Sequence, residues 1–202
     1  MEDSIWTATL AAFREKSGGT DPVPAGVAIS AVTASLALAL LAKVLAIADK
    51  KNHLAAILDA ARAESTRLAQ LADDDIQAFN QYMECKRHGR ELTDAVRKAI
   101  EVPMEAARSA VRGLDLCAQT AGVVRGLTAA DVGAAAALLS GAVRAMLLSV
   151  DFNIREMRSD AEFSSAIAAE RRDLQRASEE QADAVTAALN ASIRYARLES
   201  RL

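Results

Sequence analysis

Residues 20–42, TDPVPAGVAISAVTASLALALLA, decide what kind of fold this chain adopts. Pro22, Pro24 and Gly26 predict a turn, because proline fixes the backbone and glycine relaxes it. The alanine- and leucine-rich run that follows is apolar on almost every side, which indicates a helix buried over most of its surface. Lys43 ends the run, and its alanine, serine and threonine make it only weakly lipophilic. We therefore expect a core helix, with surplus apolar surface for a subunit interface, and no membrane partner.

The composition of the whole chain favours packed helices. Of 202 residues, 51% are hydrophobic but only 3% are aromatic, so the core must consist of alanine, leucine, valine and isoleucine. Small side chains let helices approach closely. Three prolines and nine glycines are too few to separate the strands of a large sheet. We predict one all-α domain over residues 1–202, a bundle with long apolar helices at its centre.

Hydrophobic periodicity predicts about six helices. Thr128 is the expected N-cap of the fifth, and the sequence SDAE at residues 159–162 resembles a capping box that opens the sixth. Pro103 should kink or restart the fourth helix, because proline lacks the N–H that a helix interior needs. The expected ranges are 4–16, from the turn to 49, 53–86, from 91 through Pro103, 128–157, and from about 159 to the C-terminus.

Charge and cysteine content exclude several classes of function. The net charge of −3 argues against a general nucleic-acid binder, which needs a basic face. Cys85 and Cys117 are the only cysteines, which suits a reducing compartment. The acidic N-terminus lacks the basic-then-apolar order of a signal peptide, so we expect a cytoplasmic location. There is no histidine and cysteine spacing typical of zinc and no phosphate-binding glycine loop, so we predict no metal and no covalently bound cofactor.

Asp75 is the strongest single candidate for a catalytic residue. At about 100° per residue it falls on the apolar stripe of the third helix, while Asp73 and Asp74 turn away. A carboxylate on such a stripe must be paired, hydrogen-bonded or raised in pKa. It is therefore either a general base or a structural group that caps a neighbouring helix or pairs with a buried arginine. The stripe consists of Leu54, Leu58, Ala61, Leu68, Ala72, Phe79 and Met83.

Polar residues share one face of the fifth helix. Asp131 lies near its start, and Ser149 and Asn153 lie near its end. Asp131 could instead stabilise the helix start, and Ser149 and Asn153 could bond neighbouring helices. Lys50 and Lys51 follow the second helix, where a purely structural interaction with the helix dipole is the alternative to substrate binding.

Four segments, in order along the chain, resemble one family. They are DDIQAF at 74–79, EVPMEAA at 101–107, ADVGAAA at 130–136 and SVDFN at 149–153. Together they are similar to the cyclodeaminase/cyclohydrolase family, which includes formiminotetrahydrofolate cyclodeaminase and bacterial methenyltetrahydrofolate cyclohydrolases. The resemblance implies an all-helical protein that works as a dimer or a larger assembly and acts on a tetrahydrofolate derivative, and we expect a homodimer here.

The resemblance also implies roles for particular residues. Asp75 or Asp131 would act as the general acid/base. Lys50, Lys51 and Arg125 would hold the substrate's carboxylates. Ser149 and Asn153 would orient the heterocycle, and Gly26 would present backbone N–H groups to it.

The chain departs from the family pattern at two segments. Residues 21–28 keep both prolines but only Gly26 of three glycines, so the side chains of Ala25 and Val27 are expected to narrow the approach to the backbone. Arg125 and Leu127 replace two asparagines. Three hypotheses follow: a folate C–N hydrolase or deaminase, a relative that acts on another imine, amidine or cyclic C–N substrate, and a non-catalytic helical binding or structural module.

Overall fold

The computed structural model describes residues 4–49, 53–157 and 160–199. A short 3₁₀ helix, η1, and six α-helices account for nearly all of these residues, and the described ranges contain no strand, which confirms the all-α prediction. The elements are η1 (Ile5–Thr7), α1 (Leu10–Ser17), α2 (Gly26–Ala48), α3 (Ala55–Arg87), α4 (Thr93–Ala121), α5 (Leu127–Ile154) and α6 (Ala161–Glu199).

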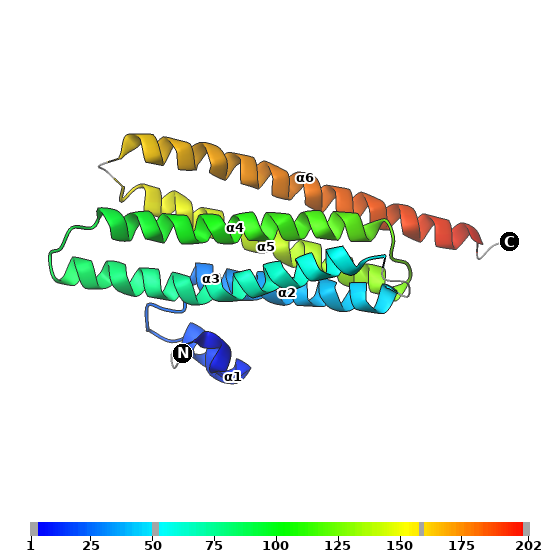
Figure 1. The fold of residues 1–202 in the computed structure, drawn as a ribbon, viewed down its shortest axis with the longest axis horizontal. Helices are drawn as coiled ribbons and strands as arrows, with labels where there is room; N and C mark the ends of the chain where they lie inside the picture. Colours follow the sequence, from blue (N-terminus) through cyan, green and yellow to red (C-terminus); the bar gives the residue numbers. More distant parts are fainter. Residues whose placement is uncertain (1–3, 50–52, 158–159, 200–202) are drawn as a thin grey trace.

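Helices α2 to α5 form an up-and-down bundle, and α6 lies along α4 and α5 (Figure 1). Helices α2 and α4 each pack against both α3 and α5, and α2 and α4 also touch each other across the bundle. Gly113 in α4 shows how closely they approach, since a Cβ atom there would lie 3.0 Å from Leu38 of α2 and 3.2 Å from Leu139 of α5. The small residues predicted to form the core therefore allow the tight packing.

Helix starts differ from the sequence prediction at two places. Residues 4–16 do not form one helix, because the Thr9 hydroxyl accepts a hydrogen bond from the Ala12 N–H at 3.1 Å and begins α1 there, separate from η1. Thr128 does not cap α5. The helix begins at Leu127 after Gly126, whose positive φ of 69° turns the chain, and the Thr128 hydroxyl donates to the Arg125 carbonyl.

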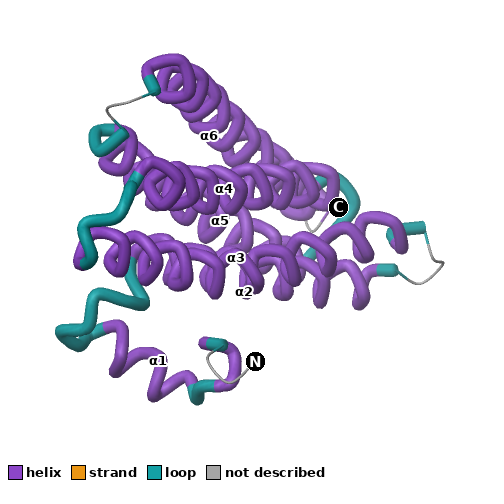
Figure 2. Tube along the Cα trace, turned by 60° about the vertical axis from the view of Figure 1, so that its left-hand side comes forward, coloured by secondary structure: helices purple, strands orange, loops and turns teal. Residues whose placement is uncertain are grey.

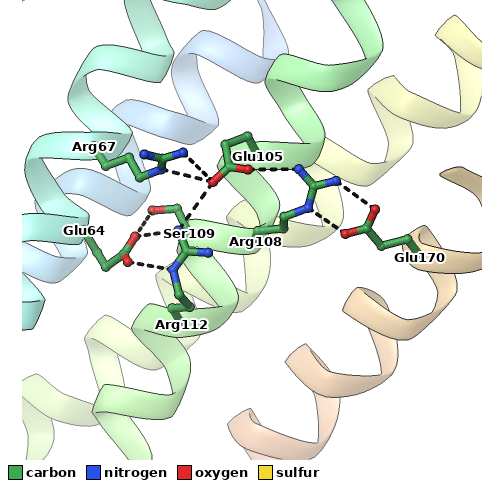
Figure 3. A network of polar contacts seen from close by, with 7 residues as sticks. All are labelled: Glu64, Arg67, Glu105, Arg108, Ser109, Arg112 and Glu170. Atoms are coloured by element: carbon green, nitrogen blue, oxygen red, sulfur yellow. Dashed lines mark hydrogen bonds and ion pairs between the residues drawn. The ribbon is translucent and has the colours of Figure 1, made fainter.

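Helix α6 buries Ile167 and Val185 in the core, and charged side chains, shown in Figure 3, also attach it to the bundle. Arg108 of α4 donates to both carboxylate oxygens of Glu170 in α6, at 2.6 and 2.8 Å, and also to Glu105. The network continues to α3 through Glu64, Arg67, Ser109 and Arg112. Asp160 caps α6 by accepting from the Phe163 N–H, whereas Ser159 of the predicted capping box lies outside the described residues.

Helices α2 and α5 are long and apolar enough to cross a membrane, with mean hydropathies of 2.2 and 1.6. About half of each apolar segment, 50% and 44%, is buried inside the bundle. Core helices of globular proteins have the same length and composition, so these values are weak evidence for a membrane span. The other residues of each helix are half-buried or exposed in the single chain.

Candidate functional site

A small pocket lies at the end of the bundle where α2 begins. Its volume is about 120 Å³. Three helices contribute its walls: α3, the first turns of α4, and the last turn of α5 with the residues just after it. The lining residues are Asp75, Phe79, Tyr82, Val96, Ala99, Asn153 and Glu156.

The carboxylate of Asp75 lines this pocket and also accepts a hydrogen bond from the backbone of α2. Burial raises the pKa of Asp75 to about 6, and a hydrogen bond from the backbone N–H of Ala28 partly opposes that shift. Ala28 lies in the first turn of α2, and the N-cap residue Ala25 has no side-chain capping bond of its own. Asp75 therefore caps a neighbouring helix, as one of the sequence alternatives supposed, while its carboxylate also lines the pocket.

Asn153 lines the pocket and is held there by a hydrogen bond to the backbone of α4. Its Nδ2 donates a 2.7 Å hydrogen bond to the Ala99 carbonyl. In a regular helix that carbonyl would accept from the N–H four residues later, but residue 103 is proline. The side chain of Asn153 satisfies the carbonyl that Pro103 leaves free, so α4 runs without a restart from Thr93 to Ala121, contrary to the alternative that Pro103 begins a new helix.

Gly26 is the first residue of α2, next to the capped turn. It is exposed, and a Cβ atom at this position would meet nothing within 4 Å. Val27 is only 6% exposed, so its side chain packs into the core and does not narrow the approach to the backbone as the sequence suggested. Ala25, the other residue expected to narrow the approach to the backbone, is exposed.

Asp131, Arg125 and Ser149, the other candidate residues that the structure describes, do not line this pocket. At about 1.5 Å of rise per residue, α5 separates Asp131 from Asn153 by about 33 Å. Arg125 precedes α5 at the same far end, where its Nη1 donates to the carbonyls of Gly122 and Val124. Ser149 is half-buried one turn before Asn153, outside the pocket lining. Lys50 and Lys51 lie outside the described residues.

Besides the small apolar residues Val96 and Ala99, three lining residues escaped the sequence analysis as site candidates. Phe79 and Tyr82 follow Asp75 at the i+4 and i+7 positions of α3, a spacing that places all three on one face. That periodicity could have identified them. Glu156 follows Asn153 by three residues, just beyond α5, and adds a second carboxylate to the pocket. Among the described residues, no group of three histidine, cysteine, aspartate or glutamate side chains could hold a metal ion.

Comparisons with known proteins agree with the resemblance. No curated protein sequence matches the chain. The crystal structure of formiminotetrahydrofolate cyclodeaminase from Thermotoga maritima superimposes with a TM-score of 0.87 at 24% identity, covering 94% of this chain and 99% of that one, which shows a shared fold. The model of the formiminotransferase-cyclodeaminase family matches residues 9–173. Since that match covers most of the sequence, the chain belongs to the formiminotransferase-cyclodeaminase family.

Proposed function

We propose that this protein catalyses C–N bond chemistry on a tetrahydrofolate derivative in the cytoplasm, either hydrolysing a methenyl bridge or deaminating a formimino group. Family membership supports the class of chemistry. The observation that carries the proposal is Asp75, a carboxylate with a pKa raised to about 6 that lines a pocket between three helices. A carboxylate with such a pKa is mostly ionised at neutral pH and can both take and return a proton.

Both reaction directions need that proton transfer. In the hydrolytic direction, Asp75 takes a proton from the water that adds to the methenyl carbon. It returns that proton to N5 as the N5–C bond breaks, and the new hydroxyl loses its proton to solvent, which leaves a formyl group on N10. In the deaminating direction, N10 attacks the formimino carbon, loses its proton to Asp75, and ammonia leaves after protonation. Each path passes through a cationic one-carbon centre, which a nearby carboxylate stabilises.

Asn153 and the first turn of α2 are the groups we propose to orient the heterocycle. The hydrogen bond to Ala99 occupies one amide hydrogen of Asn153, so its Oδ1 and its second hydrogen remain for a ligand. Gly26 leaves the backbone of the first turn open to contact. Phe79 and Tyr82 supply aromatic walls for a flat ring. Ser149 extends the same face of α5 one turn further.

A homodimer is part of this proposal, supported by apolar surface that the single chain leaves uncovered. Large exposed side chains form a stripe on each of the neighbouring helices α2 and α5, and most of them are more than half exposed. Contiguous apolar surface of this kind marks an interaction site. The residues are Ile29, Leu36 and Ile47 on α2, and Leu138, Leu148 and Phe152 on α5.

Helix α1 supports the same assembly. It has eight residues and none of them is buried, and Figures 1 and 2 both place it below α2, apart from the bundle. Isolated helices of this length are marginal in water. A second copy of the chain would give α1 and the α2/α5 face something to pack against.

An antiparallel dimer would also bring together candidate residues that lie at opposite ends of one chain. Because Asp131 and Asn153 lie about 33 Å apart on one helix, they cannot contact the same small molecule within one chain. If two chains pair through α2 and α5 in opposite directions, Asp131 and Arg125 of one copy come to lie beside Asp75 of the other. We propose this arrangement for the complete site, with Lys50 and Lys51 as further candidates to hold substrate carboxylates.

One observation favours a second candidate function. Leu127 stands at a family asparagine position and is 92% exposed at the start of α5, where it offers no hydrogen bond. Arg125 at the other asparagine position adds a cation suited to carboxylates. A relative that acts on a different imine, amidine or cyclic C–N substrate would have this pattern. A non-catalytic helical module is the remaining alternative.

The loss of methenyltetrahydrofolate absorbance with purified protein tests these hypotheses. Turnover that Asp75→Asn or Asp131→Asn abolishes would support the folate enzyme. Tetrahydrofolate binding without turnover would favour the non-catalytic module. If the protein neither turns over nor binds any tetrahydrofolate derivative, the folate proposal is wrong, and a screen of other amidines and cyclic imines becomes the test of the second function.

A further inference from the structure

A second cleft lies beside the pocket, on the other side of Phe79. Its volume is about 390 Å³, and Phe79 belongs to the lining of both. The side chains of α3 form most of its wall, and Pro22 from the turn before α2 closes one edge. The lining residues are Pro22, Phe79, Asn80, Met83, Glu84, Arg87 and His88.

The pocket with Asp75 is too small for a whole ligand of the proposed kind. Sites for drug-sized molecules occupy about 300–1,000 Å³, whereas this pocket has about 120 Å³. It can hold the reacting end of a substrate, and the rest must lie outside. The cleft on the other side of Phe79 adjoins this pocket and is large enough for the rest of the substrate.

Charge separates the two spaces. The lining of the Asp75 pocket contains two carboxylates, Asp75 and Glu156, and no cation, which suits a cationic carbon centre and repels an anionic group. The cleft contains Arg87 and His88. Its one carboxylate, Glu84, already faces Arg90 at 3.8 Å. A ligand with a cationic head and an anionic tail would therefore lie across Phe79, with the head on the Asp75 side.

The guanidinium of Arg87 is available for such a tail. It forms no hydrogen bond or ion pair with any residue in the described part of the chain. Lys86 adds a neighbouring cation, with its Nζ 5.7 Å from the centre of the Tyr82 ring in the pocket wall. Since an arginine guanidinium binds a carboxylate through two parallel hydrogen bonds, Arg87 can fix a carboxylate in one orientation.

We propose that this cleft binds the carboxylate-bearing tail of the substrate, with Arg87 as its principal contact and His88 beside it. The inference rests on the proposed function for the identity of the head group, and it gives the tail a binding site within the same chain as Asp75. It differs from the expectation that Arg125 holds the substrate's carboxylates: within one chain Arg125 lies at the opposite end of α5, so it would reach the same ligand only from the second copy of the proposed dimer.

The first test measures KM in the full-length protein for methenyltetrahydrofolate and for the primary amide of methenyltetrahydropteroate, which lacks the glutamate and has its benzoate carboxylate blocked. Arg87→Gln should raise KM for the glutamate-bearing substrate about tenfold or more, the size expected for a charged hydrogen bond, and leave kcat unchanged. KM for the tail-less compound should not change. Arg62→Gln is the matched control, since Arg62 is exposed on the same helix roughly 37 Å away.

The second test needs no catalysis. A γ-linked glutamate trimer is titrated into the wild-type protein, Arg87→Gln and Arg62→Gln at low salt, followed by calorimetry. Binding to the wild type and Arg62→Gln that is lost in Arg87→Gln supports the cleft, even if no folate is turned over and the proposed function fails. No trimer binding, or equal binding to all three proteins, overturns it. The proposal is also overturned if Arg87→Gln lowers the melting temperature and leaves trimer binding unchanged, because Arg87 would then only stabilise the C-terminus of α3.

Discussion

The side chain of Asn153 donates a 2.7 Å hydrogen bond to the Ala99 carbonyl, which Pro103 leaves without a helical partner. The proline in α4 and the asparagine in α5 therefore act together, although they lie far apart in sequence. The contact satisfies a carbonyl that would otherwise be unpaired, and it fixes the orientation of an amide in the pocket wall.

We predict that Pro103→Ala loosens Asn153. An alanine N–H at position 103 would compete for the Ala99 carbonyl, so the amide would lose its fixed orientation. We expect kcat/KM to fall severalfold while the helical content by circular dichroism stays the same. Asn153→Ala should reduce kcat/KM at least as much. Unchanged kinetics in both variants would show that the amide has no role in orienting the substrate.

Asp75→Asn should reduce kcat by about 10²–10⁴-fold, the range that general acid–base catalysis contributes. The asparagine Oδ1 can still accept from the Ala28 N–H, so the start of α2 should remain capped. Asp74→Asn is a matched control, since the Asp74 carboxylate is hydrogen-bonded to Gln70 on its own helix, outside the pocket. Equal activity in Asp75→Asn and the wild type would remove Asp75 from the mechanism.

The wild-type pH profile should follow the same carboxylate. As the base, Asp75 must be ionised, so kcat/KM should decline as the pH falls through about 6. The acid limb of the profile, measured under conditions where the protein stays folded, checks this value. An acid limb near pH 4 would mean that the carboxylate in the working enzyme is not desolvated.

Asp75→Asn should stabilise the protein at neutral pH. Burial raises the pKa of Asp75 from 3.8 to about 6, so the folded state binds this proton more tightly than the unfolded state does. The resulting stability is present below about pH 4 and is lost as the pH rises through about 6. The asparagine removes that loss, and we expect the free energy of unfolding to increase by about 1–3 kcal/mol at pH 8 but little at pH 4. Urea unfolding at both pH values measures the difference.

Mixing two inactive variants should restore activity if the complete site joins two chains. In a mixed dimer of Asp75→Asn with Asp131→Asn, one site carries both substitutions and the other carries neither. After subunit exchange of an equal mixture, about a quarter of the wild-type activity should return, because half of the dimers are mixed. Subunit exchange must first be confirmed by an independent measurement. If each variant is inactive and their exchanged mixture is also inactive, Asp75 and Asp131 do not belong to a site shared between two chains.

A separate variant tests whether α2 and α5 form the dimer interface. Leu36→Glu places a charge on the exposed α2 stripe without disturbing the core. If α2 and α5 form the dimer surface, this variant should be monomeric by light scattering and should not support recovery. A Leu36→Glu protein with the wild-type mass would move the interface elsewhere.

The sequence by itself determined the all-helical fold and singled out Asp75, because both depend on periodicity within one helix. An apolar stripe that repeats with the helical turn shows which face is buried, and a carboxylate on that stripe is conspicuous. It did not determine the exact helix starts at Leu10 and Leu127, where the hydroxyl of Thr9 and the positive φ of Gly126 decide the boundary.

Only the tertiary structure decided which candidate residues meet. Antiparallel packing brings Asp75 to the first turn of α2 and Asn153 to Ala99, and leaves Asp131 at the other end of the bundle. No local pattern carries this information, because the position of a residue along a long helix becomes a position in space only when neighbouring helices fix its direction. The carbonyl freed by Pro103 is the clearest case: the sequence shows that a hydrogen bond is missing, and the fold determines which side chain supplies it.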